Sequence, residues 1–290
     1  MKSVLIAGAT GYLGRFVVRE LKKQGYYTKV LVRSEEKTST PGNFDAPAIK
    51  EYADEIVEGE ITVPSTLVDI CEDIDYVFTS VGITRQKDKV TFRDVDYQGN
   101  LNLLREAEKH LVEKFMYIHV LTDDQGETLG PLIEAKSRFV EALVHSSIPH
   151  VVIRPSGYFS DTSELFHMAN NGRVYLFGKG SGRINPIHGH DLATFCVQSF
   201  HETNQTLDVG GPDTYTYQQI AVLAFEVLNK KERIVHIPYF LTVQALFILK
   251  FVNKHYYGLA KFMINGMSKD AVGTPRGTYK LKEYFHQISK

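Results

Sequence analysis

The fold of this chain is decided by its first 33 residues: Val-Leu-Ile-Ala at 4–7, Gly-Ala-Thr-Gly-Tyr-Leu-Gly at 8–14, a helical pattern over Arg15–Lys23, and a second apolar run over Lys29–Val32 that ends at Arg33. An apolar strand, a glycine-rich turn, an amphipathic helix and a second strand are typical of the first βαβ unit of a dinucleotide-binding sheet. We therefore predict an α/β fold, a Rossmann-type doubly wound parallel sheet with a small C-terminal substrate-binding region.

The three glycines of this turn have different expected roles. Gly8 lets the chain turn off the strand, Gly11 leaves room for backbone to approach a pyrophosphate, and Gly14 lets the helix pack close to the sheet. Unpaired N–H groups at the helix start favour an anion there. The alternative is a glycine-rich turn without a ligand. The predicted cofactor-binding residues of the loop are Gly8, Thr10, Gly11, Tyr12, Leu13 and Gly14.

The end of the second strand distinguishes the cofactors. An acid about 20 residues after the glycines would bind the ribose 2′-hydroxyl of NAD(H), but this chain has Arg33 and Ser34 there, and its first acid is Glu35. An arginine forms a bidentate pair with a 2′-phosphate. We expect NADP(H), with NAD(H) as the alternative cofactor and a solvated surface arginine as the alternative role of Arg33.

Composition describes an ordinary globular protein. The chain has 290 residues, 43% hydrophobic and 23% charged, with a net charge of −1 and two cysteines without a CxxC motif. This balanced charge argues against a nucleic-acid-binding protein, because such proteins typically have an excess of basic residues. The two isolated cysteines indicate free thiols in a reducing compartment. We expect a cytoplasmic protein, monomeric or homodimeric, that has a small-molecule substrate.

The longest apolar stretch is Tyr239–Val252, which Gln244 and Lys250 interrupt. It falls short of the ~20 residues that span a bilayer. We therefore expect no membrane span, and we interpret this stretch as a buried or interface helix. The aromatic residues between 239 and 262 are expected to lie mostly in the core.

Strand and helix patterns alternate through the first half of the chain. Further strands are predicted at 56–57, 75–81, 114–120 and 150–153, and helices at 64–71, 94–110 and 133–146. This alternation favours a parallel sheet covered on both faces. We expect a nucleotide-binding core over 1–155 and a substrate-binding region over 156–290, interleaved with and packed on that core. The polar stretch Ile83–Lys89 could form a lid.

Several ordered motifs resemble the atypical short-chain dehydrogenase/reductase superfamily and its NmrA-like NAD(P)-binding branch. They are the glycine turn at 8–14, Val-Asp-Tyr-Gln-Gly-Asn-Leu-Asn-Leu-Leu at 95–104, Arg-Pro-Ser at 154–156, Asn-Pro-Ile-His at 185–188 and Gly-Gly-Pro at 210–212. The resemblance covers nearly the whole chain. It implies a Rossmann-type sheet, an NADP(H) site and a smaller C-terminal substrate region.

The departures from that superfamily bear on catalysis. Its usual proton relay needs a tyrosine four residues before a lysine and a serine after the fifth strand; here Lys136 matches the lysine, Leu132 stands at the tyrosine position, and His119 is near the serine position. Asp96 stands where many relatives carry asparagine. Lys136 or His119 could serve as the proton donor, or the reduction could need little acid, as for a quinone. Alternatively the chain binds NADPH without turnover, as a redox sensor or assembly factor that has a protein partner.

Other site residues follow from their places in the predicted sheet. Ligands bind outside the carboxyl ends of the strands, so the predicted cofactor contacts also include Glu60, Thr79, Ser80, Val81, Gly82, Lys136, Pro155, Ser156, Gly157 and Phe159. His188, His190 and Asp191 form a possible metal-ligand group, but the stronger interpretation is that Asp191 caps a helix that begins at Leu192. We expect no metal.

Overall fold

The computed structural model describes residues 1–83, 90–122, 130–252 and 254–289. The predicted lid at Ile83–Lys89 therefore lies outside the described residues except for Ile83. A large sheet contains β1 (Ser3–Ala7), β2 (Tyr27–Val32), β3 (Glu55–Glu58), β4 (Tyr76–Thr79), β5 (Lys114–Ile118), β6 (His150–Pro155), β9 (Gln205–Gly210) and β12 (Thr274–Pro275). Its eight strands run in the order β12-β9-β6-β5-β4-β1-β2-β3.

The strand order confirms the predicted doubly wound sheet. The chain passes from β1 outward to β2 and β3, then returns to β4 on the other side of β1, and these pairs are all parallel. Every residue of β1 is buried, which is why Val4–Ala7 form a continuous apolar run. The order reverses between β1 and β4, and the carboxyl ends of these two strands are where such sheets bind ligands.

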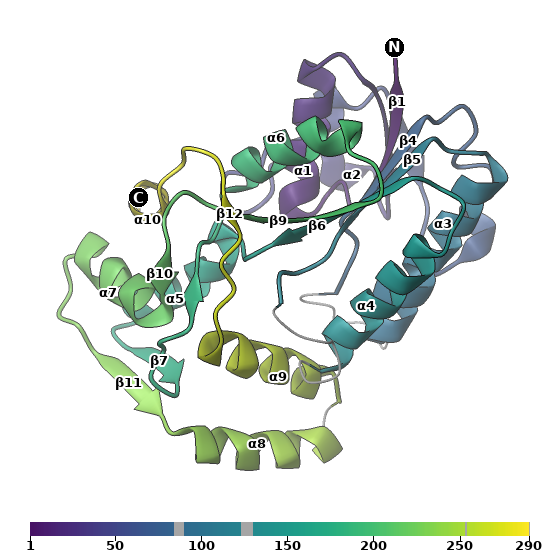
Figure 1. Ribbon diagram of the computed structural model, residues 1–290. Helices are drawn as coiled ribbons and strands as arrows, with labels where there is room; N and C mark the ends of the chain where they lie inside the picture. The colour runs from purple at the N-terminus through teal and green to yellow at the C-terminus, as the bar shows by residue number, and fades with distance from the viewer. Residues whose placement is uncertain (84–89, 123–129, 253, 290) are drawn as a thin grey trace. The chain divides into compact units, whose positions relative to one another are not determined.

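Helices cover both faces of this sheet. They are α1 (Tyr12–Lys23), α2 (Glu36–Ser39), α3 (Asn100–Lys109), α4 (Pro131–Val144) and α6 (Gly189–Gln198), and Figure 1 shows α1 and α6 on one face with α3 and α4 on the other. The predicted helix at 64–71 was wrong, because only a 3₁₀ turn forms, at Pro64–Thr66. The predicted helix at 94–110 begins as a π-helix, η3 (Arg93–Gly99), and continues as α3.

The chain divides into two compact units. The first comprises Met1–His119, Glu134–Arg154 and Leu192–Leu207, and the second comprises Val120–Ile133, Pro155–Asp191 and Asp208–Lys290. The two units are interleaved along the chain. The division into a nucleotide-binding core over 1–155 and a substrate-binding region over 156–290 remains a prediction.

The second unit is built on α5 (Phe159–Asn170), α7 (Tyr217–Val227) and α10 (Leu281–Ile288), which pack on one another. Two small sheets accompany them: β7 (Val174–Phe177) with β11 (Ile234–Ile237), and β8 (Arg183–Ile184) with β10 (Tyr215–Thr216).

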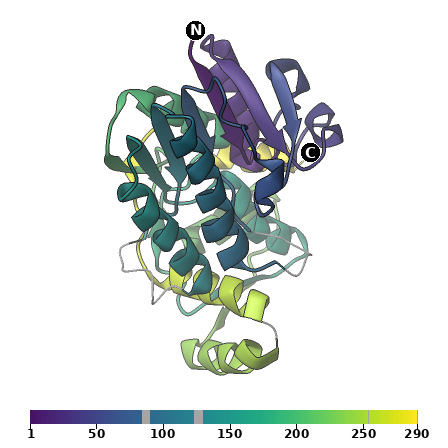
Figure 2. The same cartoon turned by 90° about the vertical axis from the view of Figure 1, so that its right-hand side faces the viewer.

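The same unit holds a helical hairpin, α8 (Tyr239–Val252) and α9 (Lys254–Ser268), drawn side by side in Figures 1 and 2. The expectation that its aromatic residues are mostly core is wrong, since Phe247 and Phe251 are 66% and 74% exposed. Among the described residues, no helix is both long and apolar enough to span a membrane.

Candidate functional site

The carboxyl ends of β1 and β4 meet at Gly8. This glycine has φ of +82°, and a Cβ on it would lie 2.8 Å from Ser80 Oγ. Its carbonyl accepts a hydrogen bond from Gly11 N at 2.9 Å. A Cβ on Gly14 would overlap the Gly8 backbone. The expected roles of Gly8 in the turn and of Gly14 in close helix packing are therefore confirmed, because neither position has room for a side chain.

The start of α1 is suited to an anion. The helix is capped by Gly11, no side chain in the described first turn caps it, and that turn contains no acid. The first amide N–H groups and the positive end of the helix dipole are therefore not neutralised by an acidic side chain of the first turn. Thr10, in the loop before the helix, and Tyr12, its first residue, are partly exposed. This is an arrangement that fits the pyrophosphate of a dinucleotide.

Arg15 was not singled out from the sequence, yet it holds the glycine turn in place. Its side chain is 4% exposed. The guanidinium donates to four carbonyl oxygens: Thr10 at 3.0 Å, Lys37 at 2.7 Å, Thr40 at 2.7 Å and Pro47 at 2.9 Å. It therefore ties the glycine turn to the loop after β2, and burial lowers the pKa of Arg15.

The end of β2 carries charges of both signs. Arg33 is exposed and Ser34 is partly exposed. Glu58, at the end of β3, accepts from the Glu35 amide at 2.7 Å. The sequence reasoning missed Glu58, although the parallel register places it beside Val32. An acid here favours a ribose hydroxyl, whereas Arg33 favours a 2′-phosphate, so the expectation of NADP(H) depends on Arg33.

The turn after β3 places Glu60 near the same edge. Glu60 N donates to Thr66 Oγ1 at 3.0 Å, and its side chain is partly exposed. A contact between Glu60 and adenine remains a prediction.

The end of β4 is fixed by a buried polar contact. Thr79 is fully buried, and its Oγ1 donates to Asn100 Oδ1 at 2.8 Å. The Asn100 amide in turn donates to the carbonyls of Val95 and Asp96, at 3.3 Å and 3.1 Å, within the π-helix. Such π-turns leave carbonyls outside the regular helix pattern and occur often at functional sites. Asn100 thus holds the strand end and the π-helix together.

The most distinctive part of the site is a buried ion pair. Lys136 Nζ lies 3.2 Å from Asp96 Oδ1, and the two side chains are 10% and 0% exposed. Ile83 N donates to the other oxygen of Asp96 at 3.1 Å. A Cβ on exposed Gly82 would lie 2.5 Å from Asp96 Oδ1 and 2.9 Å from Lys136 Nζ. Only a glycine at position 82 lets the backbone lie against this pair.

Tyr117, from β5, is the tyrosine that the structure places beside Lys136. Lys136 Nζ donates to Tyr117 Oη at 3.4 Å and lies 5.3 Å from the ring centre. Burial raises the pKa of Tyr117 to about 12, so this phenol is a weak acid at neutral pH. Sequence reasoning missed Tyr117. Tyr117 could have been found from its spacing of two residues from His119, because residues two apart in a strand lie on the same face.

The charges of the pair follow from their surroundings. Burial lowers the pKa of Lys136, but Tyr117 and Asp96 outweigh it, so the pKa lies above its ordinary value. Burial raises the pKa of Asp96 against the opposing effect of Lys136. Leu132, one helical turn before Lys136 on α4, is 5% exposed. Lys136 is therefore an ammonium at neutral pH.

His119 lies near this group but is held by its own contacts. It is 7% exposed, and its Nε2 lies 3.4 Å from Ser137 Oγ. Its ring meets Tyr117 edge-on at 6.3 Å between centres. A catalytic role for His119 remains a prediction, and the structure places Lys136 rather than His119 beside Gly82.

The predicted residues after β6 belong to the second unit from Pro155 onward. Ser156 Oγ donates to Asn185 O at 2.6 Å, and Phe159 is 2% exposed, with its ring 5.4 Å from that of Tyr284. The proposed contacts of Pro155, Ser156, Gly157 and Phe159 with a cofactor remain predictions.

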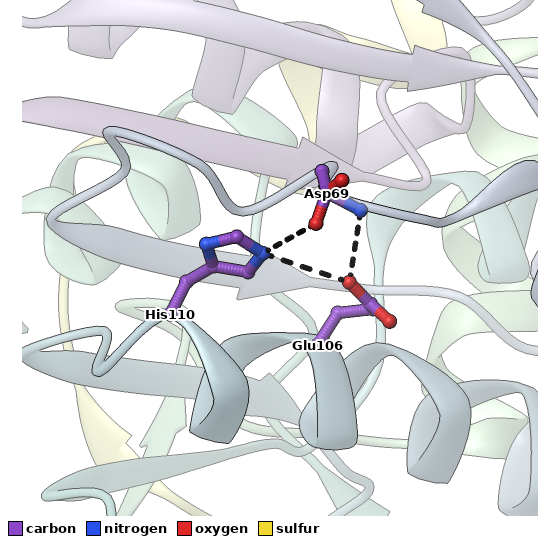
Figure 3. A group of neighbouring side chains, drawn as sticks. All are labelled: Asp69, Glu106 and His110. Carbon is purple, nitrogen blue, oxygen red and sulfur yellow. Dashed lines mark hydrogen bonds and ion pairs between the residues drawn. The ribbon is translucent and has the colours of Figure 1, made fainter.

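Two groups of side chains have the composition of a metal site. In Figure 3, His110 Nε2 lies 3.1 Å from Asp69 Oδ1 and 3.8 Å from Glu106 Oε2. Lys109 Nζ also lies 2.6 Å from Asp69 Oδ1 and lowers the pKa of that carboxyl. Lys109 forms an ion pair with Asp69, and the His110 ring lies within hydrogen-bonding distance of the same carboxylate, so the cluster is explained without an ion.

The second group is His188, His190 and Asp191. The expected N-cap role of Asp191 is wrong, because α6 begins at Gly189. Its Oδ2 instead accepts from the amides of Thr278 and Tyr279, at 2.9 Å and 3.0 Å. His188 stacks on the Tyr279 ring at 4.1 Å. These contacts tie the start of α6 to the segment before α10.

Comparison with known proteins agrees with this geometry. The profile of a family described as NAD(P)H-binding matches residues 8–203. The chain is 28% identical over 240 residues to the photosystem II assembly factor Ycf39 of Synechocystis, covering 81% of this chain and 70% of the relative. It is 27% identical over 261 residues to the chloroplastic divinyl chlorophyllide a 8-vinyl-reductase of Arabidopsis thaliana, covering 81% and 60%.

A solved structure has the same fold. The NADPH-dependent quinone oxidoreductase of Escherichia coli, complexed with NADPH, superposes with a TM-score of 0.70 at 16% identity, covering 99% of this chain and 100% of that one. At this identity the likeness establishes the fold alone.

Proposed function

Because the chain belongs to the NAD(P)H-binding family, we propose that it is an NADPH-dependent reductase of a small apolar or quinone-like substrate. The observation that carries this proposal is the buried Lys136–Asp96 pair beside Gly82. It lies after β4, on the edge of the sheet where Rossmann-type proteins bind their ligands.

In the proposed reaction Lys136 and Asp96 have different roles. Bound NADPH supplies a hydride. The Lys136 ammonium stabilises negative charge on a substrate oxygen, because a preorganised cation in a water-poor site needs no reorganisation during the reaction. Asp96 holds that ammonium in one position and keeps it charged. In this proposal Lys136 is the catalytic residue and Asp96 is a positioning residue.

We infer the substrate class from the weak acidity of the tyrosine beside Lys136. Tyr117 has a pKa of about 12, so it does not replace the superfamily's proton-donating tyrosine. A quinone or another conjugated acceptor forms a delocalised oxyanion on hydride addition, which can take its proton later from water. Such a substrate needs charge stabilisation more than general acid catalysis.

The test is NADPH oxidation with a panel of quinones, conjugated enones and simple carbonyls. We expect turnover of the first two classes by the wild type, and a loss of about 10²- to 10³-fold in kcat for Lys136→Met, the size of effect seen when one oxyanion donor is removed. Tyr117→Phe should keep most of the activity. NADPH affinity, measured by fluorescence titration, reports whether each variant still binds the cofactor.

A matched control is available in the same unit. Lys114 is also buried, and its Nζ donates to Phe200 O at 2.6 Å at the opposite end of β5. Lys114→Met removes a buried lysine without touching the proposed site, so it should lower stability and leave kcat unchanged. NADPH binding without turnover across the whole panel would contradict the reductase proposal.

The second candidate is an NADPH-binding sensor or assembly factor without turnover. Its support is the similarity to an assembly factor, together with the neutralisation of Lys136 by Asp96. Tight binding of NADPH, no oxidation of it, and a partner whose binding changes between NADPH and NADP⁺ would favour this function.

We further infer NADP(H) rather than NAD(H) as the cofactor, with Arg33 as the discriminating residue. The cytoplasmic location and a monomeric or homodimeric state are also proposals. Cell fractionation tests the first, and light scattering during size-exclusion chromatography tests the second.

A further inference from the structure

The exposed face of α8 is an aromatic stripe, which we define as Phe240, Val243, Phe247 and Phe251. These side chains are 62%, 49%, 66% and 74% exposed. Their spacing of three or four residues places them on one side of the helix, and the stripe is ~16 Å long at 1.5 Å per residue. Thr242, on the opposite side, is 3% exposed. Contiguous exposed apolar side chains of this size mark an interaction surface.

The hairpin that carries the stripe has charge of one sign only. The whole chain holds 34 acidic residues among 290, yet none lies between Arg233 and Lys269. That segment contains five Lys or Arg residues: Arg233, Lys250, Lys254, Lys261 and Lys269. Lys250 is exposed and lies on α8 within one turn of Phe247 and Phe251. Lys250 therefore places a cation beside the stripe, in a segment whose sequence contains no acid.

We propose that α8 lies on the surface of a membrane containing anionic lipid, with the aromatic stripe inserted at the boundary between headgroups and acyl chains. Binding at this boundary strengthens with the apolar area that is inserted and with electrostatic attraction to anionic lipid, and the stripe with Lys250 beside it supplies both. The cations add attraction to anionic headgroups. The proposal is independent of the nucleotide site and of the reaction proposed there.

Charge and shape favour a lipid surface over a second copy of this chain. A symmetric pairing of two stripes uses the same surface of both copies, and so would bring the Lys250 cation of each copy to one interface. Gln244 is the exposed polar side chain next to Phe240 and Phe247 on this side of the helix, and a headgroup at the membrane boundary can accept its hydrogen bonds. A fluid anionic surface also complements the charge.

Vesicle co-sedimentation tests the proposal. We expect the intact chain to sediment with vesicles of phosphatidylcholine and phosphatidylglycerol and to stay in solution with phosphatidylcholine alone. Raising the salt from ~0.1 M to ~1 M should release it. Lys250→Glu should weaken binding by at least about fivefold, since each cation at an anionic surface contributes about that factor. Replacing Phe247 and Phe251 together by serine should weaken it by at least about tenfold.

Matched controls separate the stripe from general surface chemistry. Val68 and Leu111, in the first unit, are 60% and 85% exposed. Their double substitution by serine removes exposed apolar groups, and Arg105→Glu reverses an exposed helical cation. Neither control should change sedimentation. Circular dichroism and NADPH affinity verify that each variant is folded.

A second measurement locates the contact. The chain contains no tryptophan, so Phe247→Trp gives a single fluorescent reporter. Its emission should shift to the blue and be quenched by spin-labelled lipid, whereas that of Leu111→Trp should not. Failure to bind anionic vesicles, or binding that the stripe variants leave unchanged, overturns the proposal. A wild-type dimer or a complex with an acidic protein that the same variants dissociate, without vesicle binding, overturns it as well.

Discussion

Replacing Lys136 by methionine should destabilise the protein far more than breaking a shorter surface ion pair. The change leaves the fully buried Asp96 carboxylate with backbone donors alone among the described residues, chiefly the Ile83 amide at 3.1 Å. Removing one partner of a buried pair costs about 3–5 kcal/mol, because an uncompensated charge stays in the interior. That is a large part of the ~5–15 kcal/mol by which a typical domain is stable.

The surface pair Lys282–Glu226 is the matched comparison. Its atoms lie 2.6 Å apart, closer than the 3.2 Å between Lys136 and Asp96, but its side chains are 50% and 57% exposed. Exposed pairs contribute about 0–1 kcal/mol. Lys282→Met should therefore cost no more than ~1 kcal/mol, so burial and not distance sets the order of the two losses.

The stability lost in Lys136→Met should depend on pH. Burial raises the pKa of Asp96 in the folded state, so folding takes up a proton between the ordinary aspartate value of ~3.9 and that raised pKa. Stability then falls as pH rises through this window. Without the Lys136 ammonium the pKa rises further, so the deficit of Lys136→Met should be smallest in acid and largest at neutral pH.

Urea denaturation at several pH values measures these free energies, and a double-mutant cycle with Asp96→Asn isolates the pair. Asparagine keeps an acceptor for the Ile83 amide but carries no charge, so the double variant should recover most of the stability lost by Lys136→Met. A loss below ~1 kcal/mol, a loss that does not vary with pH, or a double variant as unstable as the single one would refute the reasoning.

Four further outcomes are expected. Arg33→Ala should weaken NADPH binding about tenfold or more and leave NADH binding unchanged in calorimetric titration, because a charged hydrogen bond to the 2′-phosphate contributes about 1.5–3 kcal/mol; an equal loss for both cofactors would contradict this. Arg15→Lys should weaken both, since an ammonium cannot reach four carbonyls at once, whereas unchanged affinities would refute that positioning role. Gly82→Ala should cost about 1–3 kcal/mol in urea denaturation, because its Cβ would overlap the ion pair; wild-type stability would count against the geometry. The thiols of Cys71 and Cys196 are buried, with the pKa of Cys71 raised to about 12, so a thiol reagent should modify them only after unfolding; rapid labelling of the native protein would disprove this.

Local sequence predicts the nucleotide-binding half of the fold well. The glycines at 8–14 and the apolar run before them permit one arrangement, because Gly8 and Gly14 occupy places where a side chain would collide with backbone or with Ser80. The parallel sheet follows from the alternation of strand and helix. These features depend on residues close in the sequence, so pattern alone reveals them.

The candidate site is less accessible from the sequence, since its partners come from separate elements. Lys136 and Asp96 were both noted, but their pairing depends on the packing of α4 and the π-helix against the ends of β4 and β5. Tyr117 was missed, because its closeness to Lys136 is a tertiary contact. Arg15 was read only as the start of a helix pattern, and its four carbonyl partners lie in loops without a recognisable motif.

The hairpin shows a different limit. The apolar stretch at 239–252 correctly predicted a helix, but composition cannot tell a helix that packs into a core from one that presents the same residues to its surroundings. The informative signal was the absence of acid between residues 233 and 269.

The π-helix at Arg93–Gly99 makes this site sensitive to insertion and deletion. A π-turn holds one residue more than the α-helix around it, so deleting a single residue there would give a regular helix. The residues before the deletion would then rotate by about 100° relative to α3. Asp96 would leave Lys136 even if every side chain named here were kept. The number of residues between β4 and Asn100, and not their identity alone, is therefore part of what specifies the site.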